Sequence, residues 1–154
     1  MATFEELDAK IQTFPGGFTG GGGVSEAEID NLGAELGFKI RGTFRQFLKK
    51  FGWIDIAYSE IFGLGEGVPD HLELKGMTLS ERSQMHPSLA PNLLPFFNDG
   101  GGNLYCLDLA GSDVEPPVVL WLHDLSAEQA PEPASVSFAS WLADELAERE
   151  DDFR

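Results

Sequence analysis

The spacing of the apolar residues changes at Trp53, from a helical repeat of three to four residues to the two-residue repeat of strands. Before this point, Phe44, Phe47 and Phe51 lie on one face of a helix predicted from about Thr43. After it, residues 53–58 alternate, which is typical of a half-buried strand. A chain with helices first, then strands joined by short loops, favours segregated helices and antiparallel hairpins over a parallel βαβ repeat.

Helix starts are indicated by capping boxes, in which Ser or Thr is followed three residues later by Glu. Such pairs begin at Thr3, Ser25 and Thr78, so we expect helices over 3–14, from 25 to a glycine cap at Gly37, and from 78 to before Pro87. A last helix is expected from about Ser137, with an apolar stripe that includes Trp141.

Strands are predicted from alternating and β-branched runs. The first run places Tyr58 on the same side as Ile54 and Ile56, and the Pro131-x-Pro133 segment is assigned to a loop. The predicted strands cover residues 53–58, 61–64, 94–97, 104–109 and 118–123. We therefore predict an α+β fold: a single domain with a twisted, mainly antiparallel sheet and helices packed around it.

The chain divides into four segments. Residues 1–15 form an N-terminal helix, and residues 16–24 form a glycine-rich linker with six glycines between Gly16 and Gly23. A phosphate-binding loop is the alternative for this linker, but no Lys-Ser/Thr pair follows it and no strand precedes it. Residues 25–147 form the α+β domain, and residues 148–154 form an acidic C-terminal tail.

Charge narrows the possible partners. With 10 basic and 26 acidic residues, the 154-residue chain has a net charge of −16. This opposes binding to nucleic acid or to an anionic membrane surface, and it favours a positively charged partner. No long apolar run and no signal-peptide pattern is present, and the single cysteine allows no internal disulfide. We expect a cytoplasmic protein.

The basic residues are concentrated in one segment. Residues 39–50 hold five of them and no acid, so the rest of the chain carries five basic against 26 acidic residues, a difference of −21. The segment is either a solvated helix face that offsets the acidic majority or one pole of a dipolar surface whose acidic face binds a basic partner. Candidate partner-binding acids near strand ends and loops are Asp55, Glu60, Glu66, Asp70, Asp99, Asp113, Glu115 and Asp124.

Catalytic and metal-binding patterns are weak. Cys106 lies alone in a predicted strand and is expected to be a buried structural thiol. Asp99, Asn103 and Asp108 could supply oxygen ligands to calcium, but their spacing is not that of an EF-hand, and a glycine-rich turn explains them more simply. His123 and the adjacent Asp124 would point to opposite faces of a strand. We expect no enzyme, no cofactor and no metal site.

An ordered series of motifs resembles the SUKH superfamily, which comprises cell-wall-assembly-regulator-like domains of fungi and bacterial immunity proteins. The series runs from about residue 25 to residue 142. Its most specific block is the segment 98–108, Asn-Asp-Gly-Gly-Gly-Asn-Leu-Tyr-Cys-Leu-Asp. The chain departs from the pattern at Arg41-Gly42, where many members have a proline, and at Leu122, where many have an acid. The motif residues are Gly63, Leu64, Pro95, Asp99, Gly100, Gly102, Asn103, Tyr105, Cys106, Leu107, Asp108, Trp121 and His123.

The resemblance implies a domain that works by binding another protein. Bacterial members resemble antidotes that neutralise a cognate toxin, often a nuclease or a deaminase, by direct contact, whereas fungal members resemble intracellular scaffold or regulatory modules. A basic toxin surface would suit the acidic majority of this chain. A third hypothesis, a hydrolase using His123, Asp99 and Asp108, would require those side chains to meet in one pocket.

Overall fold

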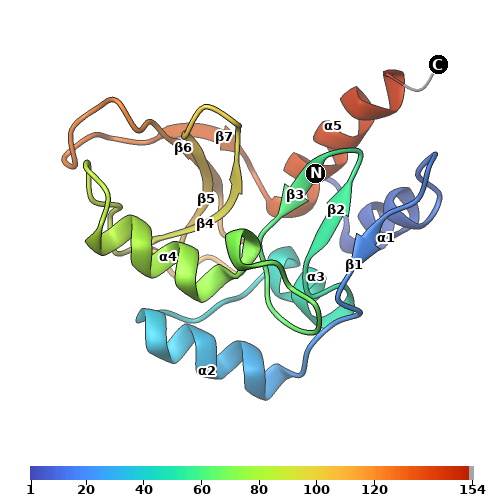
Figure 1. Ribbon diagram of the computed structural model, residues 1–154, viewed down its shortest axis with the longest axis horizontal. Helices are drawn as coiled ribbons and strands as arrows, with labels where there is room; N and C mark the ends of the chain where they lie inside the picture. The colour runs from blue at the N-terminus through green and yellow to red at the C-terminus, as the bar shows by residue number, and fades with distance from the viewer. Residues whose placement is uncertain (153–154) are drawn as a thin grey trace.

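Two antiparallel sheets and five α-helices make up residues 1–152, the part of the chain described by the computed structural model (Figure 1). One sheet has the order β1-β2-β3 and the other β4-β5-β6-β7. The helices are α1 (Phe4–Gln12), α2 (Glu26–Leu36), α3 (Thr43–Lys50), α4 (Leu74–Ser83) and α5 (Phe138–Asp151), with a 3-10 turn η1 at Asp70–Leu72. The strands are β1 (Thr19–Gly20), β2 (Ile54–Ile56), β3 (Ser59–Ile61), β4 (Leu93–Asn98), β5 (Leu104–Asp108), β6 (Val118–Trp121) and β7 (Glu132–Ser135). The α+β prediction is confirmed.

The two sheets lie beside each other, joined where the first hairpin meets β4. The backbone N–H of Phe62 donates to the carbonyl of Phe96 over 2.9 Å at this junction. Aromatic rings fill the core next to this junction. The ring centroid of Phe138, on α5, lies 4.9 Å from that of Phe44 on α3 and 5.0 Å from that of Phe96 on β4. Helices α1, α3 and α5 pack together on this core, and α4 packs against β4 (Figure 1).

Helix starts follow the capping boxes in two of three cases. Thr3 and Ser25 cap α1 and α2 as predicted, and Gly37 ends α2 in the left-handed conformation with φ +92°. The third helix is present, but its predicted start is wrong: α4 begins one turn earlier, capped by Glu73, whose carboxylate accepts the Gly76 N–H over 2.8 Å. Thr78 lies in mid-helix, buried, with its hydroxyl donating to the Leu74 carbonyl.

Three strand predictions need correction. The second strand, predicted over 61–64, lies instead at Ser59–Ile61. The first strand ends at Ile56, and Tyr58 lies in the two-residue turn before Ser59, 92% exposed, instead of beside Ile54 on the buried face. The segment around Pro133, assigned to a loop, forms the edge strand β7. Proline is tolerated there because an edge strand has a free side that needs no N–H donor.

The glycine-rich segment differs from the flexible linker expected for residues 16–24. It contains β1, which pairs with β2, and it continues along the end of α3, where Gly21 N–H donates to the Phe51 carbonyl over 3.1 Å. Glycine is required at position 23, because a Cβ there would lie 2.2 Å from the carbonyl oxygen of Lys49. The segment is therefore packed backbone, and it places α1 against α5.

The C-terminal acidic residues also belong to the fold. Helix α5 starts after its cap at Ser137, as predicted, and continues to Asp151, so most of the predicted 148–154 tail is helical. Residues 153 and 154 lie outside the described part of the chain. None of the helices within residues 1–152 is long and apolar enough to span a membrane.

Candidate functional site: an acidic interaction surface

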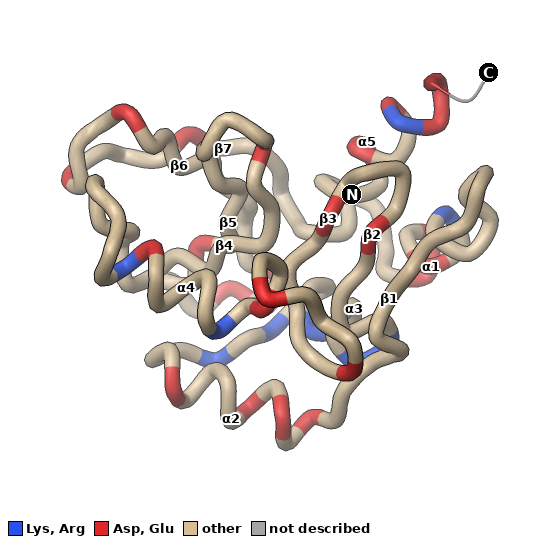
Figure 2. Tube along the Cα trace, in the orientation of Figure 1, with Lys and Arg blue, Asp and Glu red and all other residues tan. Residues whose placement is uncertain are grey.

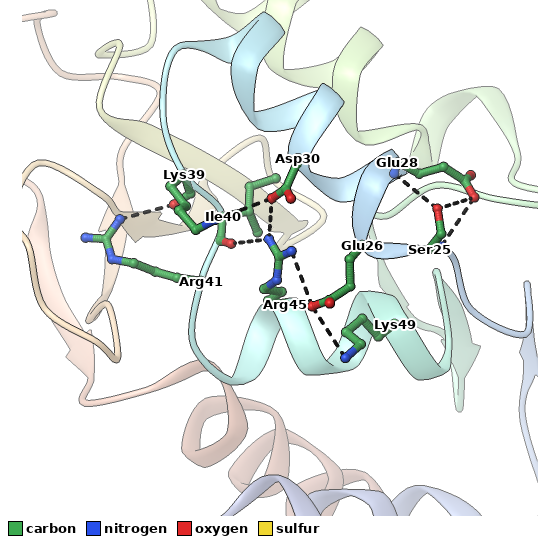
Figure 3. A network of polar contacts seen from close by, with 9 residues as sticks. All are labelled: Ser25, Glu26, Glu28, Asp30, Lys39, Ile40, Arg41, Arg45 and Lys49. Carbon is green, nitrogen blue, oxygen red and sulfur yellow. Dashed lines mark hydrogen bonds and ion pairs between the residues drawn. The ribbon is translucent and has the colours of Figure 1, made fainter.

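The basic segment 39–50 runs close to the acidic residues of α2 (Figure 2), and several of its side chains pair with them (Figure 3). Arg45 of α3 reaches α2, where its guanidinium lies 2.8 Å from an Asp30 carboxylate oxygen and 3.4 Å from Glu26. The same guanidinium donates to the Ile40 carbonyl. Its hydrogen bond holds the pKa of the Asp30 carboxyl below the usual value. Lys49 lies 3.5 Å from Glu26 on the same face.

The other basic side chains of the segment are engaged as well. Lys39 lies 3.6 Å from Asp30, and Lys50 pairs with Asp8 of α1. Arg41 points away from α2 (Figure 3) and donates to the backbone carbonyls of Gly111 and Asp113. The segment therefore offsets acids of α1 and α2 and holds a loop.

Four of the eight predicted acids lie around the first hairpin and the glycine-rich turn after β4. Asp55 and Glu60 are register partners on β2 and β3. Burial, and then the charge of Glu60, raise the pKa of the Asp55 carboxyl. Glu60 also lies 2.9 Å from the Nε2 atom of His71, which follows Asp70 in η1. A hollow of about 260 Å³, lined by Glu60 and Gly100 among others, connects this group to the turn that contains Asp99.

The turn itself is held by its own side chains. Asp99 accepts the backbone N–H groups of Gly101 (2.8 Å) and Asn103 (3.1 Å) through one carboxylate oxygen. The Asn103 side-chain oxygen in turn binds the backbone N–H of His123 (3.1 Å) and lies 2.7 Å from its Nδ1. This is the turn geometry predicted in preference to calcium binding.

Asp108, the third residue of the calcium and hydrolase hypotheses, lies at the other end of β5, paired with Leu93. Its carboxylate accepts from the Asn92 amide over 2.9 Å and from the Ala110 N–H over 3.0 Å. The structure therefore does not bring Asp108 to His123 and Asp99. Among residues 1–152, no group of three or more potential ligands is placed to hold a metal ion.

Two predicted partner-binding acids are engaged within the protein. Glu115 is half-buried, and its two oxygens accept the backbone N–H (3.0 Å) and hydroxyl (3.2 Å) of Thr43. Burial is the main cause that raises the pKa of the Glu115 carboxyl. Asp113, in the same loop, is exposed and gives its backbone carbonyl to Arg41. Gly42, just before Thr43, has φ +79°, and a Cβ there would lie 2.9 Å from a carboxylate oxygen of Glu115.

Glu66 and Asp124 lie in two other loops. Both side chains are exposed. Glu66 lies in the loop after β3, and its backbone carbonyl accepts the Trp53 indole N–H over 3.0 Å. Asp124 lies in the loop after β6, next to His123. The eight predicted acids therefore do not form one cluster.

A groove that the sequence reasoning missed lies between α5 and the second sheet. It has a volume of about 360 Å³, and its lining includes Tyr105, Trp141 and the carboxylates of Glu132, Asp144, Glu145 and Glu148. Burial, followed by the charges of Asp99, Glu145 and Glu148, raises the pKa of the Tyr105 hydroxyl. The sequence contains a signal for the α5 side of this groove, because positions 141, 144, 145 and 148 have the spacing of one helix face.

We use the term acidic surface for the carboxylates of these two neighbouring regions. Its members are Asp55, Glu60, Asp70 and Asp99 around the first hairpin and the turn, and Glu132, Asp144, Glu145 and Glu148 at the groove.

The motif residues serve the fold. A Cβ at Gly63 would lie 1.6 Å from the carbonyl oxygen of Gly52, so only glycine allows the two loops to touch. Cys106 is fully buried, and burial raises the pKa of its thiol well above the usual value, as expected of a structural thiol. Trp121 is also buried, at 1% exposure. The remaining motif positions are distributed over the same loops and strands: Leu64, Pro95, Gly100, Gly102 and Leu107.

Comparison with known families agrees with this arrangement. A family model described as the SMI1-KNR4 cell-wall family, of the SUKH group, matches residues 26–142, which is most of the chain. The chain belongs to the SUKH family. The matched range of this SUKH domain begins at the start of α2 and ends inside α5. No curated protein matches the chain.

Proposed function

We propose that this SUKH protein neutralises a cognate toxin by direct protein–protein binding, in the cytoplasm of a bacterium and without catalysis. The toxin is a protein with a basic surface, of the nuclease or deaminase class. Such enzymes hold nucleic acid on clusters of Lys and Arg, and an acidic protein that covers this surface excludes the substrate.

One observation carries the proposal: the separation of charge in the folded protein. The basic residues of segment 39–50 are directed to acids and carbonyls of the same chain, as with Arg45 on Asp30. The acidic surface lies elsewhere, on the first hairpin, the turn after β4 and helix α5 (Figure 2). An excess of carboxylates on one surface attracts a basic partner and increases the rate of association, although Glu145 of this surface pairs with Arg149 of the same helix.

Charge alone does not provide the affinity that neutralisation needs. A nanomolar complex corresponds to about −12 kcal/mol. In protein interfaces most of that free energy comes from a few desolvated aromatic and arginine contacts, and rim charges mainly set rate and specificity. Tyr105, which is half-buried at the acidic groove, is of a residue type that provides such contacts, whereas Trp141 beneath it is already buried in the core.

Co-expression tests the proposal. The protein is produced together with the toxin encoded next to its gene, and growth is compared with that of cells expressing the toxin alone. We expect growth to be restored and a stoichiometric complex to purify. Failure of both, with the protein folded and abundant, would contradict toxin neutralisation.

The second candidate is an intracellular scaffold or regulatory module, which is favoured by the cell-wall description of the matched family. It predicts several weaker partners and no adjacent toxin gene. Affinity purification followed by titration separates the two candidates: one tight partner supports the toxin antidote, and several micromolar partners support the scaffold.

A further inference from the structure

The tip of the first hairpin has an unusual backbone. Ile56 pairs with Ser59, so the turn between β2 and β3 consists of Ala57 and Tyr58 alone. Both have left-handed backbones, with φ of +50° and +66°, and within residues 1–152 they are the non-glycine residues with positive φ. Two-residue turns of this kind ordinarily contain Asn-Gly, because a Cβ is disfavoured there. The sequence Ala-Tyr therefore stores strain at the tip.

The strained turn holds a large aromatic side chain in solvent. Tyr58 is 92% exposed, the most exposed large hydrophobic residue in the described part of the chain. Across the turn, Phe18 is 37% exposed and rests edge-on against Phe51, with ring centroids 5.6 Å apart. Strain that persists at a surface site favours a functional role for the residues concerned, and tyrosine is a frequent anchor in protein interfaces.

A hollow separates the two aromatic residues. Its volume is about 330 Å³, and its lining consists of residues 15–19, Asp55, Ala57 and Tyr58. The lining holds one carboxylate, Asp55, and no Lys or Arg. Aromatic walls beside a carboxylate suit a cation, because the face of a ring and a negative charge both attract it. The planar guanidinium of arginine can stack on a ring and pair with a carboxylate simultaneously.

We propose that Tyr58 and Phe18 are the anchor of the partner-binding surface. The hollow between them receives a basic side chain from the partner protein, and it binds arginine in preference to lysine. Tyr58 enters the partner's surface, while Asp55 pairs with the inserted cation. This inference rests on the proposed function, and it names the contact through which the acidic surface engages its basic partner.

The test uses opposite effects on stability and on binding. In the double variant Ala57→Asn/Tyr58→Gly, the turn receives its preferred residues, so we expect the melting temperature to rise by about 2–4 °C. Binding to an inactive form of the toxin should weaken at least 10-fold, because the anchor is lost. Tyr58→Phe keeps the ring and should bind within threefold of wild type. Val114→Ser, at an exposed apolar position outside this surface (86% exposed), should change neither property.

A second measurement needs no toxin. We expect titration with N-acetyl-arginine amide, followed by NMR, to shift the amide signals of Phe18, Asp55 and Tyr58, and the uncharged N-acetyl-norleucine amide to leave them unchanged. Equal effects of both compounds, or shifts elsewhere only, would overturn the binding of a cation in the hollow.

The two proposals fail in different ways. If wild type binds the toxin and the double variant binds it equally well, the anchor is excluded and toxin neutralisation stands. If wild type neither binds the toxin nor restores growth, the proposed function is excluded. In that case the arginine titration decides between a cation-binding hollow and an inert one.

Discussion

Single residues show how a side chain far away in sequence completes a local structure. Helix α3 begins after Gly42, which has no side chain to cap it. Its first N–H, from Thr43, is instead bound by Glu115, 72 positions later in the chain. Sequence reasoning assigned Glu115 to partner binding, because an acid in a loop is usually exposed. No local pattern reveals that the loop folds back onto the helix.

Replacing Glu115 tests this contact. We expect Glu115→Ala to lower the free energy of unfolding by about 1–2 kcal/mol, the usual cost of a lost helix cap. Because the pKa of this carboxyl is raised in the folded protein, the native state binds the proton more tightly than the unfolded chain. The stability that Glu115 contributes is therefore greatest below its unfolded pKa and falls as the pH rises through the folded pKa.

Urea unfolding of wild type and Glu115→Ala, each at pH 4 and pH 7, measures this difference. The cost of the substitution should be larger at pH 4. Glu128→Ala, at an exposed acid in the loop after β6, serves as the control and should alter stability little at either pH. An equal or smaller cost at pH 4 would contradict the assigned direction of the pKa shift.

At the scale of elements, predictions succeeded where the signal is local. Thr3 and Ser25 each cap a helix through residues three positions away, so sequence alone suffices. Thr78 has the same pattern and fails, because Glu73 offers an earlier cap and the Thr78 hydroxyl bonds within the helix. Strand β7 was missed for the opposite reason: its prolines oppose a strand locally, and only pairing with β6 makes it one.

The contact between α2 and α3 gives a prediction at this scale. Arg45 is mostly covered and links both helices, so we expect Arg45→Met to destabilise the protein by about 1 kcal/mol. A double-mutant cycle with Asp30→Asn should give a favourable coupling that decreases with salt. The more exposed pair Lys75–Glu35 is the matched control and should couple more weakly. Equal coupling in both pairs would show that the covered position of Arg45 does not strengthen its ion pair with Asp30.

At the scale of the whole molecule, composition gave the sign of the charge but not its location. The basic segment was visible in the sequence, and so was the acidic remainder of −21. The pairing of Arg45 with α2, however, depends on how two helices pack. The groove at α5 required Tyr105, Glu132 and Glu148 to meet from three elements, and no spacing within one segment encodes that.

The acidic surface predicts a steep salt dependence of association. We expect the rate constant for toxin binding to fall at least 10-fold between 20 mM and 150 mM salt, while the dissociation rate changes little, because exposed charges are screened over about 8–10 Å. Stopped-flow fluorescence measures both rates. Asp144→Asn/Glu148→Gln should flatten the dependence more than Glu5→Gln/Glu128→Gln, which removes the same charge elsewhere. A flat response in wild type would exclude electrostatic steering.

The contact between the first and last helices sets when folding can finish. Helix α1 packs on α5, and the Ala2 N–H donates to the Ser140 hydroxyl across 138 positions. Each sheet pairs strands in chain order, and the strands of the second sheet follow one another directly, so that sheet can form from nearby segments during synthesis. Leu7 and Ile11, in contrast, are covered completely only in the assembled core, to which α5 contributes. Until α5 has emerged from the ribosome, α1 can pack only on α3 and lacks the rest of its cover, so the complete core forms only after the α5 segment is available.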